Sequence, residues 1–398
     1  MKKNFFIKLT AILLSPLLLF SFVGALASDE VIPINDTAND EEAPAKDTLQ
    51  LDCKSAILME ASTGKVLYEQ NADEALPPAS VTKIMTLLLV MEAVDGGRIA
   101  LSDPVTVSAH AASMGGSQVY LKEGETMTVE EMLKCVVIAS ANDCAVALAE
   151  HVAGSEEQFV RDMNARAAAL GMTQTNFENT NGLDDTAVNH VTSARDIAIM
   201  SRALIAHEKI LAYSGIWMDT VRDGSFGLTN TNRLVRFYRG CTGLKTGSTA
   251  RAKFCISATA QRDGVSLIAV VMAADTRDGR NQIAAQLLDY GFANFCTFEA
   301  AAGELSRAVT GGVSSVCPLT YAPFAATVQK GASTRVETVI ELPETLTAPI
   351  AAGETVGRVV YRLDGKEIGA VPIVAAECVE KIGFGTLFWR ILQQFLLL

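Results

Sequence analysis

The sequence predicts an α+β domain over residues 51–298 and a small all-β domain over residues 303–376. Helical patterns with capping signals occupy the middle of the first domain, and strand-like apolar runs lie at its ends, which is typical of α+β folds. Short alternating segments around the hairpin dipeptide Asp364-Gly365 predict the second domain. The chain has 398 residues, of which 49% are hydrophobic, so it is long enough to form both cores.

Residues 1–27 are typical of a secretory signal peptide. A lysine-containing start precedes an apolar stretch, and Ala-Leu-Ala at residues 25–27 provides a small-residue cleavage site. Residues 28–50 contain many acidic residues and a single lysine, which predicts a disordered linker. The chain carries a net charge of −12, which argues against a nucleic-acid partner. We therefore expect an exported, acidic protein.

The elements of the first domain begin with a β-hairpin over residues 54–70, which turns at Ser62-Thr63-Gly64. The apolar run Ile84–Glu92 contains no Gly or Pro and predicts a buried helix, which the chain enters through Pro77-Pro78. Thr128 begins a capping-box pattern ahead of the next helix. Further helices are expected at residues 132–138, 144–151, 155–171, 193–206 and 282–295. Strands are expected at residues 217–221, 233–238, 244–247, 255–259 and 265–273, with short strands within 104–127 and a loop at 179–189.

Ser80 and Lys83 lie at the start of the first predicted helix, three residues apart, so the Lys83 amine can reach the Ser80 hydroxyl. A serine hydroxyl becomes a good nucleophile when a base removes its proton, and a buried lysine that is kept neutral can be that base. The helix N-terminus adds backbone N–H groups that can bind an oxyanion. Alone the pattern is weak, because about one or two chance matches are expected in a chain of this length. Ser62 and Lys65 form such a match, in the turn of the predicted hairpin.

Two further polar patterns follow. Ser140 and Asn142 lie at a break between two predicted helices, where a hydroxyl can relay a proton and an amide can orient a substrate amide. Their alternative role is helix capping. Lys245-Thr246-Gly247 lies on a predicted strand and is followed by Ser248. The lysine and threonine can bind a carboxylate, and the glycine lets a substrate backbone approach, although an ordinary strand-end turn has the same composition.

Taken together and in this order, the three patterns resemble those of the serine D-alanyl-D-alanine carboxypeptidases, the low-molecular-mass penicillin-binding proteins of bacterial cell walls. The resemblance extends over nearly the whole chain beyond the signal peptide, and one departure occurs at Ala252-Lys253-Phe254, where the family usually has a glycine and an aromatic residue. It implies a β-lactamase/transpeptidase-like catalytic domain, with an antiparallel sheet and a helical subdomain. Further segments that resemble the family are Asn181-Gly182-Leu183-Asp184, residues 192–196, residues 230–232 and Gly243-Leu244.

The resemblance implies a role for each pattern residue. Ser80 would attack the carbonyl between the two terminal D-alanines of a peptidoglycan stem peptide, with Lys83 as base and Ser140 passing the proton to the departing D-alanine. The backbone N–H groups of Ser80 and Ser248 would form the oxyanion hole. No cofactor or metal is implied, and β-lactam antibiotics are the expected inhibitors. The residues expected to bind substrate are Asn142, Lys245, Thr246, Gly247 and Ser248.

Two other functions share these motifs. A serine β-lactamase would need a deacylating carboxylate, and Glu178 lacks the expected spacing for it. A non-catalytic wall-binding protein would normally have lost at least one motif residue. A Ser-His-Asp hydrolase is unsupported, because no Gly-x-Ser-x-Gly occurs. Arg233 is a weaker candidate for carboxylate binding, with a solvated strand arginine as its alternative, and His190 is expected to be a structural loop histidine.

The C-terminal residues 379–398 have apolar side chains on one side of a predicted helix and Arg390, Gln393 and Gln394 on the other. This pattern favours an interfacial helix that anchors the protein peripherally to the outer face of the cytoplasmic membrane. Packing on the β domain and a dimer contact are the alternatives. The chain has eight cysteines and no Cys-x-x-Cys, so a zinc site is not expected, and one or two disulfides stay open.

Overall fold

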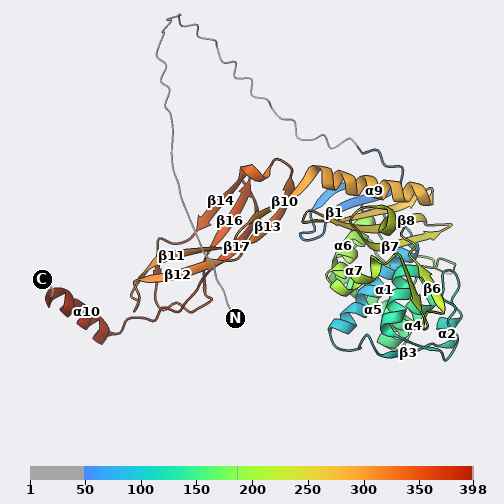
Figure 1. Ribbon diagram of the computed structural model, residues 1–398, viewed down its shortest axis with the longest axis horizontal. Coiled ribbons are helices and arrows are strands. Elements are labelled where there is room, and N and C mark those ends of the chain that lie inside the picture. The colour runs from blue at the N-terminus through green and yellow to red at the C-terminus, as the bar shows by residue number, and fades with distance from the viewer. Residues whose placement is uncertain (1–48, 186, 397–398) are drawn as a thin grey trace, which may run out of the picture. The chain divides into compact units, whose positions relative to one another are not determined.

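A computed structural model describes residues 49–185 and 187–396 (Figure 1). The predicted signal peptide, and all of the predicted linker except residues 49 and 50, lie outside the described residues. No helix in the described part is both long and apolar enough to cross a bilayer.

A five-stranded antiparallel sheet forms the centre of the first domain, in the order β2-β1-β9-β8-β7. The predicted hairpin supplies β1 and β2, so the first and last parts of the domain meet in one sheet. The three later strands are longer than the sequence pattern indicated. The strands are β1 (Ser55–Glu60), β2 (Val66–Gln70), β7 (Cys241–Thr249), β8 (Lys253–Arg262) and β9 (Val265–Ala274).

Helices cover both faces of this sheet (Figure 1). Helix α9 (Arg277–Asn294) packs on one face, where its Leu287 and Leu288 join the alternate apolar residues of β8 and β9 in one core. Helices α1 (Lys83–Asp95) and α6 (Ala194–Ile205) lie against the other face, in a second and larger core. The mixed α+β fold predicted from the sequence is therefore confirmed.

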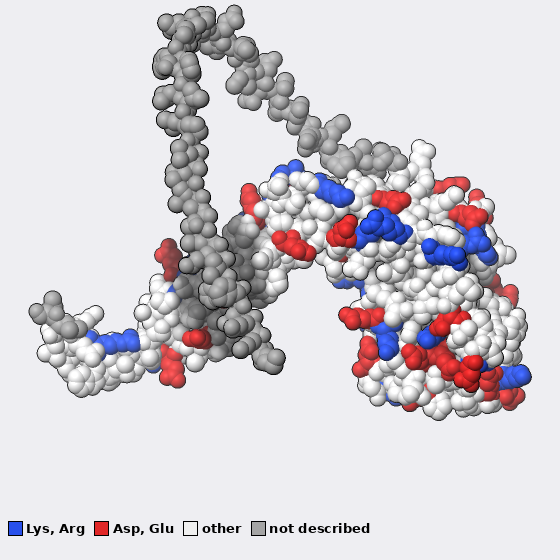
Figure 2. Space-filling view, in the orientation of Figure 1, with Lys and Arg blue, Asp and Glu red and all other residues white. Residues whose placement is uncertain are grey.

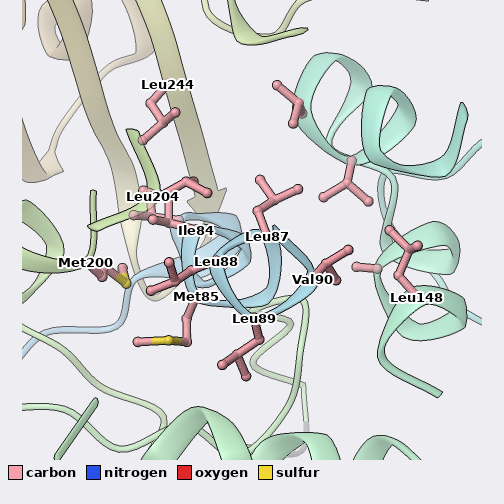
Figure 3. Packing of buried hydrophobic residues seen from close by; sticks show 14 of the residues in the cluster. Ile84, Met85, Leu87, Leu88, Leu89, Val90, Leu148, Met200, Leu204 and Leu244 are labelled. Carbon is pink, nitrogen blue, oxygen red and sulfur yellow. The ribbon is translucent and has the colours of Figure 1, made fainter. Parts of the chain in front are cut away.

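Helix α1 is buried on all sides, as its uninterrupted apolar sequence predicts. Figure 3 shows side chains leaving the helix in every direction: Leu87 and Val90 point toward the helix that carries Leu148, and Ile84 points toward Leu204. Because a fully surrounded helix cannot shift without disturbing several neighbours, α1 is a rigid support for the residues at its N-terminus.

The helical subdomain contains the expected capping box, in which Thr128 and Glu131 satisfy each other's backbone N–H groups at the start of α3 (Val129–Lys134). A π-helical turn, Cys135–Ala139, follows α3, and the chain then bends at Ser140. The other elements are the 3₁₀ turn η1 (Ala79–Thr82), β3 (Pro104–Thr106), α2 (Ala109–Ala112), β4 (Thr126–Thr128), α4 (Asn142–Ala153), α5 (Glu156–Ala169), α7 (Glu208–Ser214), β5 (Met218–Val221) and β6 (Phe226–Thr229).

The prediction of a strand at residues 233–238 is wrong, because the structure has the short helix α8 (Leu234–Phe237) there. The Asn232 side chain accepts a hydrogen bond from Leu234 N at 3.0 Å, and turn hydrogen bonds follow, including Arg236 N to Arg233 O at 3.1 Å. An amide side chain that bonds to the backbone two residues on closes a turn, so it overrides the strand-like alternation of this segment.

The later part of the chain is all-β, as predicted. Six strands form a sheet in the order β14-β16-β17-β12-β11-β15, and β10 pairs with β13. Tyr361 is buried at the centre of this domain and stacks on Phe324 with 4.3 Å between ring centroids. The strands are β10 (Phe295–Ala300), β11 (Gly303–Thr310), β12 (Val316–Tyr321), β13 (Phe324–Gln329), β14 (Val336–Glu341), β15 (Thr345–Thr347), β16 (Thr355–Leu363) and β17 (Lys366–Ala375).

The chain continues into α10 (Phe384–Leu396), a helix whose large apolar residues, including Phe384, Phe388 and Phe395, are exposed. On the face shown in Figure 2, Lys and Arg are interspersed with Asp and Glu rather than gathered in a continuous basic surface. All eight cysteines are free thiols in the structure.

Candidate active site

The Ser80–Lys83 pair lies where the chain enters α1. Ser80 is within the η1 turn rather than in the helix itself, and Lys83 is the first residue of α1. Lys83 Nζ is 2.8 Å from Ser80 Oγ and 2.8 Å from the carbonyl oxygen of Asn181. The predicted contact between the hydroxyl and the amine is therefore present.

The Lys83 amine is completely buried. Burial lowers the pKa of Lys83 well below that of an ordinary lysine, and the nearby Lys245 cation lowers it further. A lowered pKa favours the neutral amine, whose lone pair is available for the Ser80 proton. The local environment thus suits Lys83 for use as a base.

Ser140 and Lys245 form a second pair, in which Lys245 Nζ donates to Ser140 Oγ at 2.9 Å. The same amine also donates to the carbonyl oxygen of Thr246, the next residue in the chain, at 2.9 Å. Ser140 has φ = 64°, in the left-handed region, because the π-helical turn ends at this residue before α4 begins. Burial, with a smaller contribution from the Arg280 cation, lowers the pKa of Lys245 to about 7. This lysine can therefore gain or lose a proton near neutral pH.

Asn142 lies in the first turn of α4, and its backbone N donates to Ser117 O at 2.7 Å. Its side-chain Nδ2 donates to Gly115 O at 2.7 Å. Its Oδ1 is buried and has no hydrogen-bond partner among the described residues. A buried acceptor without a donor is unfavourable, so a donor that reached this oxygen would stabilise it.

Strand β7 runs along the nucleophile turn and brings Thr246, Gly247 and Ser248 beside Ser80. A Cβ at Gly247 would lie 2.7 Å from Pro78 O and 2.9 Å from Ser80 N, so only glycine permits this approach. The Thr246 hydroxyl donates to Thr231 Oγ1 at 2.8 Å. The resulting cleft, of about 160 Å³, is lined by Ser80, Ser117, Ser140, Thr231, Thr246, Gly247, Ser248, Arg277 and Arg280.

Several residues of this cleft were not predicted from the sequence, and Arg280 is the most informative. Its side chain is 3% exposed, and it donates to Cys255 O at 3.3 Å. The late helix was predicted to begin at residue 282, whereas α9 begins at Arg277 after its cap, Thr276. Thr276, followed three residues later by Gly279, is a helix-start signal in the sequence. It predicts a longer helix that includes Arg280.

The other candidates lie outside the cleft. Arg233 forms an exposed ion pair with Asp278 at 3.5 Å and does not line the cleft, in agreement with its solvated alternative. The Glu178 carboxylate accepts hydrogen bonds from the backbone N atoms of Val188 and Asn189. Ser62, of the chance Ser-x-x-Lys match, donates to Glu60 at 2.7 Å in the hairpin turn. No Asp or Glu is among the cleft-lining residues in the part of the chain that the structure describes.

Each of the three motifs contributes a residue to this one cleft. The chain that carries them matches known families over most of its length. Residues 38–276 match the D-alanyl-D-alanine carboxypeptidase family, and residues 305–381 match the penicillin-binding protein 5 C-terminal domain. The chain belongs to the D-alanyl-D-alanine carboxypeptidase family. The resemblance inferred from the sequence motifs is thereby confirmed, and so is the expectation of a serine-type carboxypeptidase.

Curated relatives of this carboxypeptidase are similar along most of their length. The chain is 44% identical over 347 residues to the D-alanyl-D-alanine carboxypeptidase DacF of Bacillus subtilis, covering 85% of this chain and 89% of the relative. It is 36% identical over 360 residues to DacC of Escherichia coli, covering 87% of this chain and 88% of the relative.

Solved structures share the fold of this carboxypeptidase. Penicillin-binding protein 5 from Haemophilus influenzae superposes with a TM-score of 0.72 at 32% identity, covering 84% of this chain and 99% of that protein. Penicillin-binding protein D2 from Listeria monocytogenes, solved in an ampicillin-bound form, superposes with a TM-score of 0.57 at 32% identity, covering 62% of this chain and 99% of that protein. The predicted transpeptidase-like fold followed by a β domain and a final helix is thus confirmed.

Proposed function

We propose that this carboxypeptidase removes the terminal D-alanine from a peptidoglycan stem pentapeptide through an acyl-enzyme on Ser80. The observation that carries the proposal is the 2.8 Å contact between Ser80 Oγ and Lys83 Nζ, an amine whose pKa is lowered by complete burial. Lys83 takes the hydroxyl proton as Ser80 Oγ attacks the carbonyl carbon between the two D-alanines. The negative charge on the carbonyl oxygen then develops opposite the backbone N–H groups of Ser80 and Ser248.

Ser140 and Lys245 supply the acid side of the reaction. When the carbon–nitrogen bond breaks, the departing D-alanine nitrogen takes up a proton, which Ser140 Oγ delivers. Lys245 donates to that hydroxyl at 2.9 Å, and its pKa of about 7 allows it to replace the proton. A water molecule afterwards hydrolyses the ester on Ser80 and releases the shortened peptide.

The terminal carboxylate of the substrate binds at β7. Thr246 offers a hydroxyl, Lys245 and the buried Arg280 supply positive charge, and Gly247 lets the peptide backbone approach the strand. Asn142 Oδ1 accepts the amide N–H that precedes the scissile bond, which satisfies an otherwise unpaired acceptor. This arrangement favours a peptide that ends in a free carboxylate as the substrate.

The same geometry favours a long-lived acyl-enzyme with β-lactam antibiotics. A β-lactamase requires a base that activates water against the acyl-enzyme, and no carboxylate lines the cleft in the described residues. Benzylpenicillin is therefore expected to act as an inhibitor rather than as a substrate that is turned over rapidly.

We also propose export by the signal peptide at residues 1–27 and peripheral attachment through the C-terminal residues 379–398. The exposed apolar side chains of α10 support the attachment, because an amphipathic helix binds the boundary between lipid headgroups and acyl chains. Residues 51–298 would carry the catalysis, and residues 303–376 would hold that domain away from the helix.

Mass spectrometry of the protein without residues 1–27, after brief incubation with benzylpenicillin, tests the nucleophile. We expect a stable adduct on the unmodified chain and on Ser62→Ala, which removes the serine of the chance motif, and no adduct on Ser80→Ala. D-alanine release from a pentapeptide should be lost in the same variant. Rapid penicillin turnover without a lasting adduct would favour a β-lactamase, and neither adduct nor D-alanine release would favour a non-catalytic wall-binding protein.

A further inference from the structure

The loop at residues 178–185 and 187–190 contacts the nucleophile turn and helix α1. Thr86 donates to Thr180 O at 2.6 Å, one turn along α1 from the Lys83 amine, which donates to Asn181 O at 2.8 Å. Gly182 is so close to the Ala79 carbonyl that a Cβ at this position would collide with it. The loop thus contacts both the helix that carries the base and the residue that precedes Ser80.

His190, at the end of this loop, is 3% exposed and lies between two hydrogen-bond partners. Its Nδ1 accepts from Glu178 N at 3.0 Å, so the neutral ring carries its proton on Nε2. Nε2 is 2.7 Å from Thr82 Oγ1 and donates to it. Burial lowers the pKa of His190 to about 4 and outweighs the opposing effect of the Glu178 and Asp184 carboxylates, so the ring is neutral at neutral pH.

Thr82 links His190 to the nucleophile turn through a second hydrogen bond. Because Thr82 Oγ1 accepts a hydrogen bond from His190, its own hydroxyl proton points to the Ala79 carbonyl oxygen, 2.8 Å away. The Ala79 carbonyl belongs to the same planar peptide unit as Ser80 N–H, so fixing one orients the other. Ala79 has φ = 49°, a conformation that is unfavourable for alanine and needs support from its surroundings.

We propose that His190 is a positioning residue for acylation: through Thr82 it fixes the Ala79–Ser80 peptide plane and thereby aims the Ser80 N–H at the developing oxyanion. Neither residue contacts the substrate. The inference rests on the proposed role of Ser80 as nucleophile. Since the oxyanion contact forms in the transition state, its misalignment lowers the acylation rate constant and leaves the saturation constant for the inhibitor unchanged.

Two substitutions at His190 separate this role from simple anchoring of the loop. His190→Gln places an amide NH₂ where Nε2 donates to Thr82, whereas His190→Asn can keep only the contact with Glu178 N. We expect His190→Asn to acylate with benzylpenicillin about 10- to 100-fold more slowly than the unmodified chain, and His190→Gln to stay within about threefold of it. Thermal unfolding of the two variants should be similar, because both lose the same ring.

Thr82→Val provides an independent test with little change in volume. It removes the hydroxyl that links His190 to Ala79, so it should slow acylation to a similar degree, and combining it with His190→Asn should add almost nothing. An unchanged acylation rate in His190→Asn, equal losses in both His190 variants, or fully multiplicative effects of Thr82→Val and His190→Asn would each overturn the proposal. Failure of the proposed function would appear separately, as an adduct that persists in Ser80→Ala.

Discussion

At the residue scale, the site depends on two buried lysines that have different tasks. Lys83 contacts the nucleophile and has its pKa lowered well below the ordinary value, whereas Lys245 has a pKa of about 7. Both lie in the same low-dielectric region, so a proton on either one disfavours a proton on the other. The lowered pKa of Lys83 favours a free base, whereas Lys245, with a pKa of about 7, can carry a proton near neutral pH.

This difference predicts a bell-shaped pH dependence for acylation by benzylpenicillin. As the pH rises through about 7, Lys245 loses the proton that it shares with Ser140 and the charge that attracts the inhibitor's carboxylate, so the second-order acylation constant should fall. As the pH falls, Lys83 becomes protonated and can no longer accept the Ser80 proton. Stopped-flow measurements on both sides of pH 7, extended into acid as far as the protein stays folded, would test for both limbs.

Lys245→Gln is the control for this profile, since it should lower the rate at every pH and remove the limb near pH 7 while keeping the acid limb. A wild-type profile that stays flat between about pH 6 and 9 would contradict the assigned role of Lys245.

At the element scale, the site requires β7 and the η1 turn to lie closer than side chains normally allow. Gly247→Ala should separate the strand from Ser80, because the new Cβ would meet backbone atoms at 2.7 and 2.9 Å that cannot rotate away. We expect an acylation rate lowered by about 100-fold with the fold retained. The rate can be measured with a fluorescent penicillin.

Gly227→Ala is a matched control, because Gly227 is also within a strand, β6, and a Cβ there meets nothing within 4 Å. It should acylate normally. Equal rates for Gly247→Ala and Gly227→Ala would mean that the close approach of β7 is not needed for catalysis.

The elements themselves differ in how far their sequence predicted them. Helix α1 was predicted because its apolar residues run without interruption, and the sheet strands because β-branched and apolar residues fill them. The strand prediction for residues 233–238 was wrong because the Asn232 side-chain oxygen accepts a hydrogen bond from Leu234 N and closes a turn. The π-helical turn before Ser140 contains no Gly or Pro that would mark it, so the sequence indicated only a break between two helices.

At the scale of the whole molecule, the site is built from segments that are far apart in the chain. Ser80 and Lys83 come from the entry to α1, Ser140 from a bend between helices, and Lys245 from β7. Each short motif was visible in the sequence, but their meeting depends on the sheet topology. Arg280 reaches the cleft and His190 reaches Thr82 only through tertiary packing, so no sequence pattern placed either residue beside Ser80.

Membrane attachment belongs to this scale as well. Phe388→Glu places a charge on the apolar side of α10 and should strongly reduce co-sedimentation of the protein with anionic lipid vesicles, since a charge opposes burial below the headgroups. Gln394→Glu adds the same charge on the polar side and should bind almost as well as the unmodified protein. D-alanine release from a soluble pentapeptide should be the same for both variants. Equal vesicle binding by the two would exclude insertion of the apolar side.

The buried Asn142 Oδ1, in its proposed role, discriminates between inhibitors that carry an amide N–H and those that do not. In the proposed complex, this buried acceptor pairs with an amide N–H of the ligand. A compound with an ester oxygen in place of that amide would fit the same space yet leave the acceptor unpaired and face a second lone pair. We therefore expect an amide-bearing inhibitor to acylate the enzyme faster than its ester analogue.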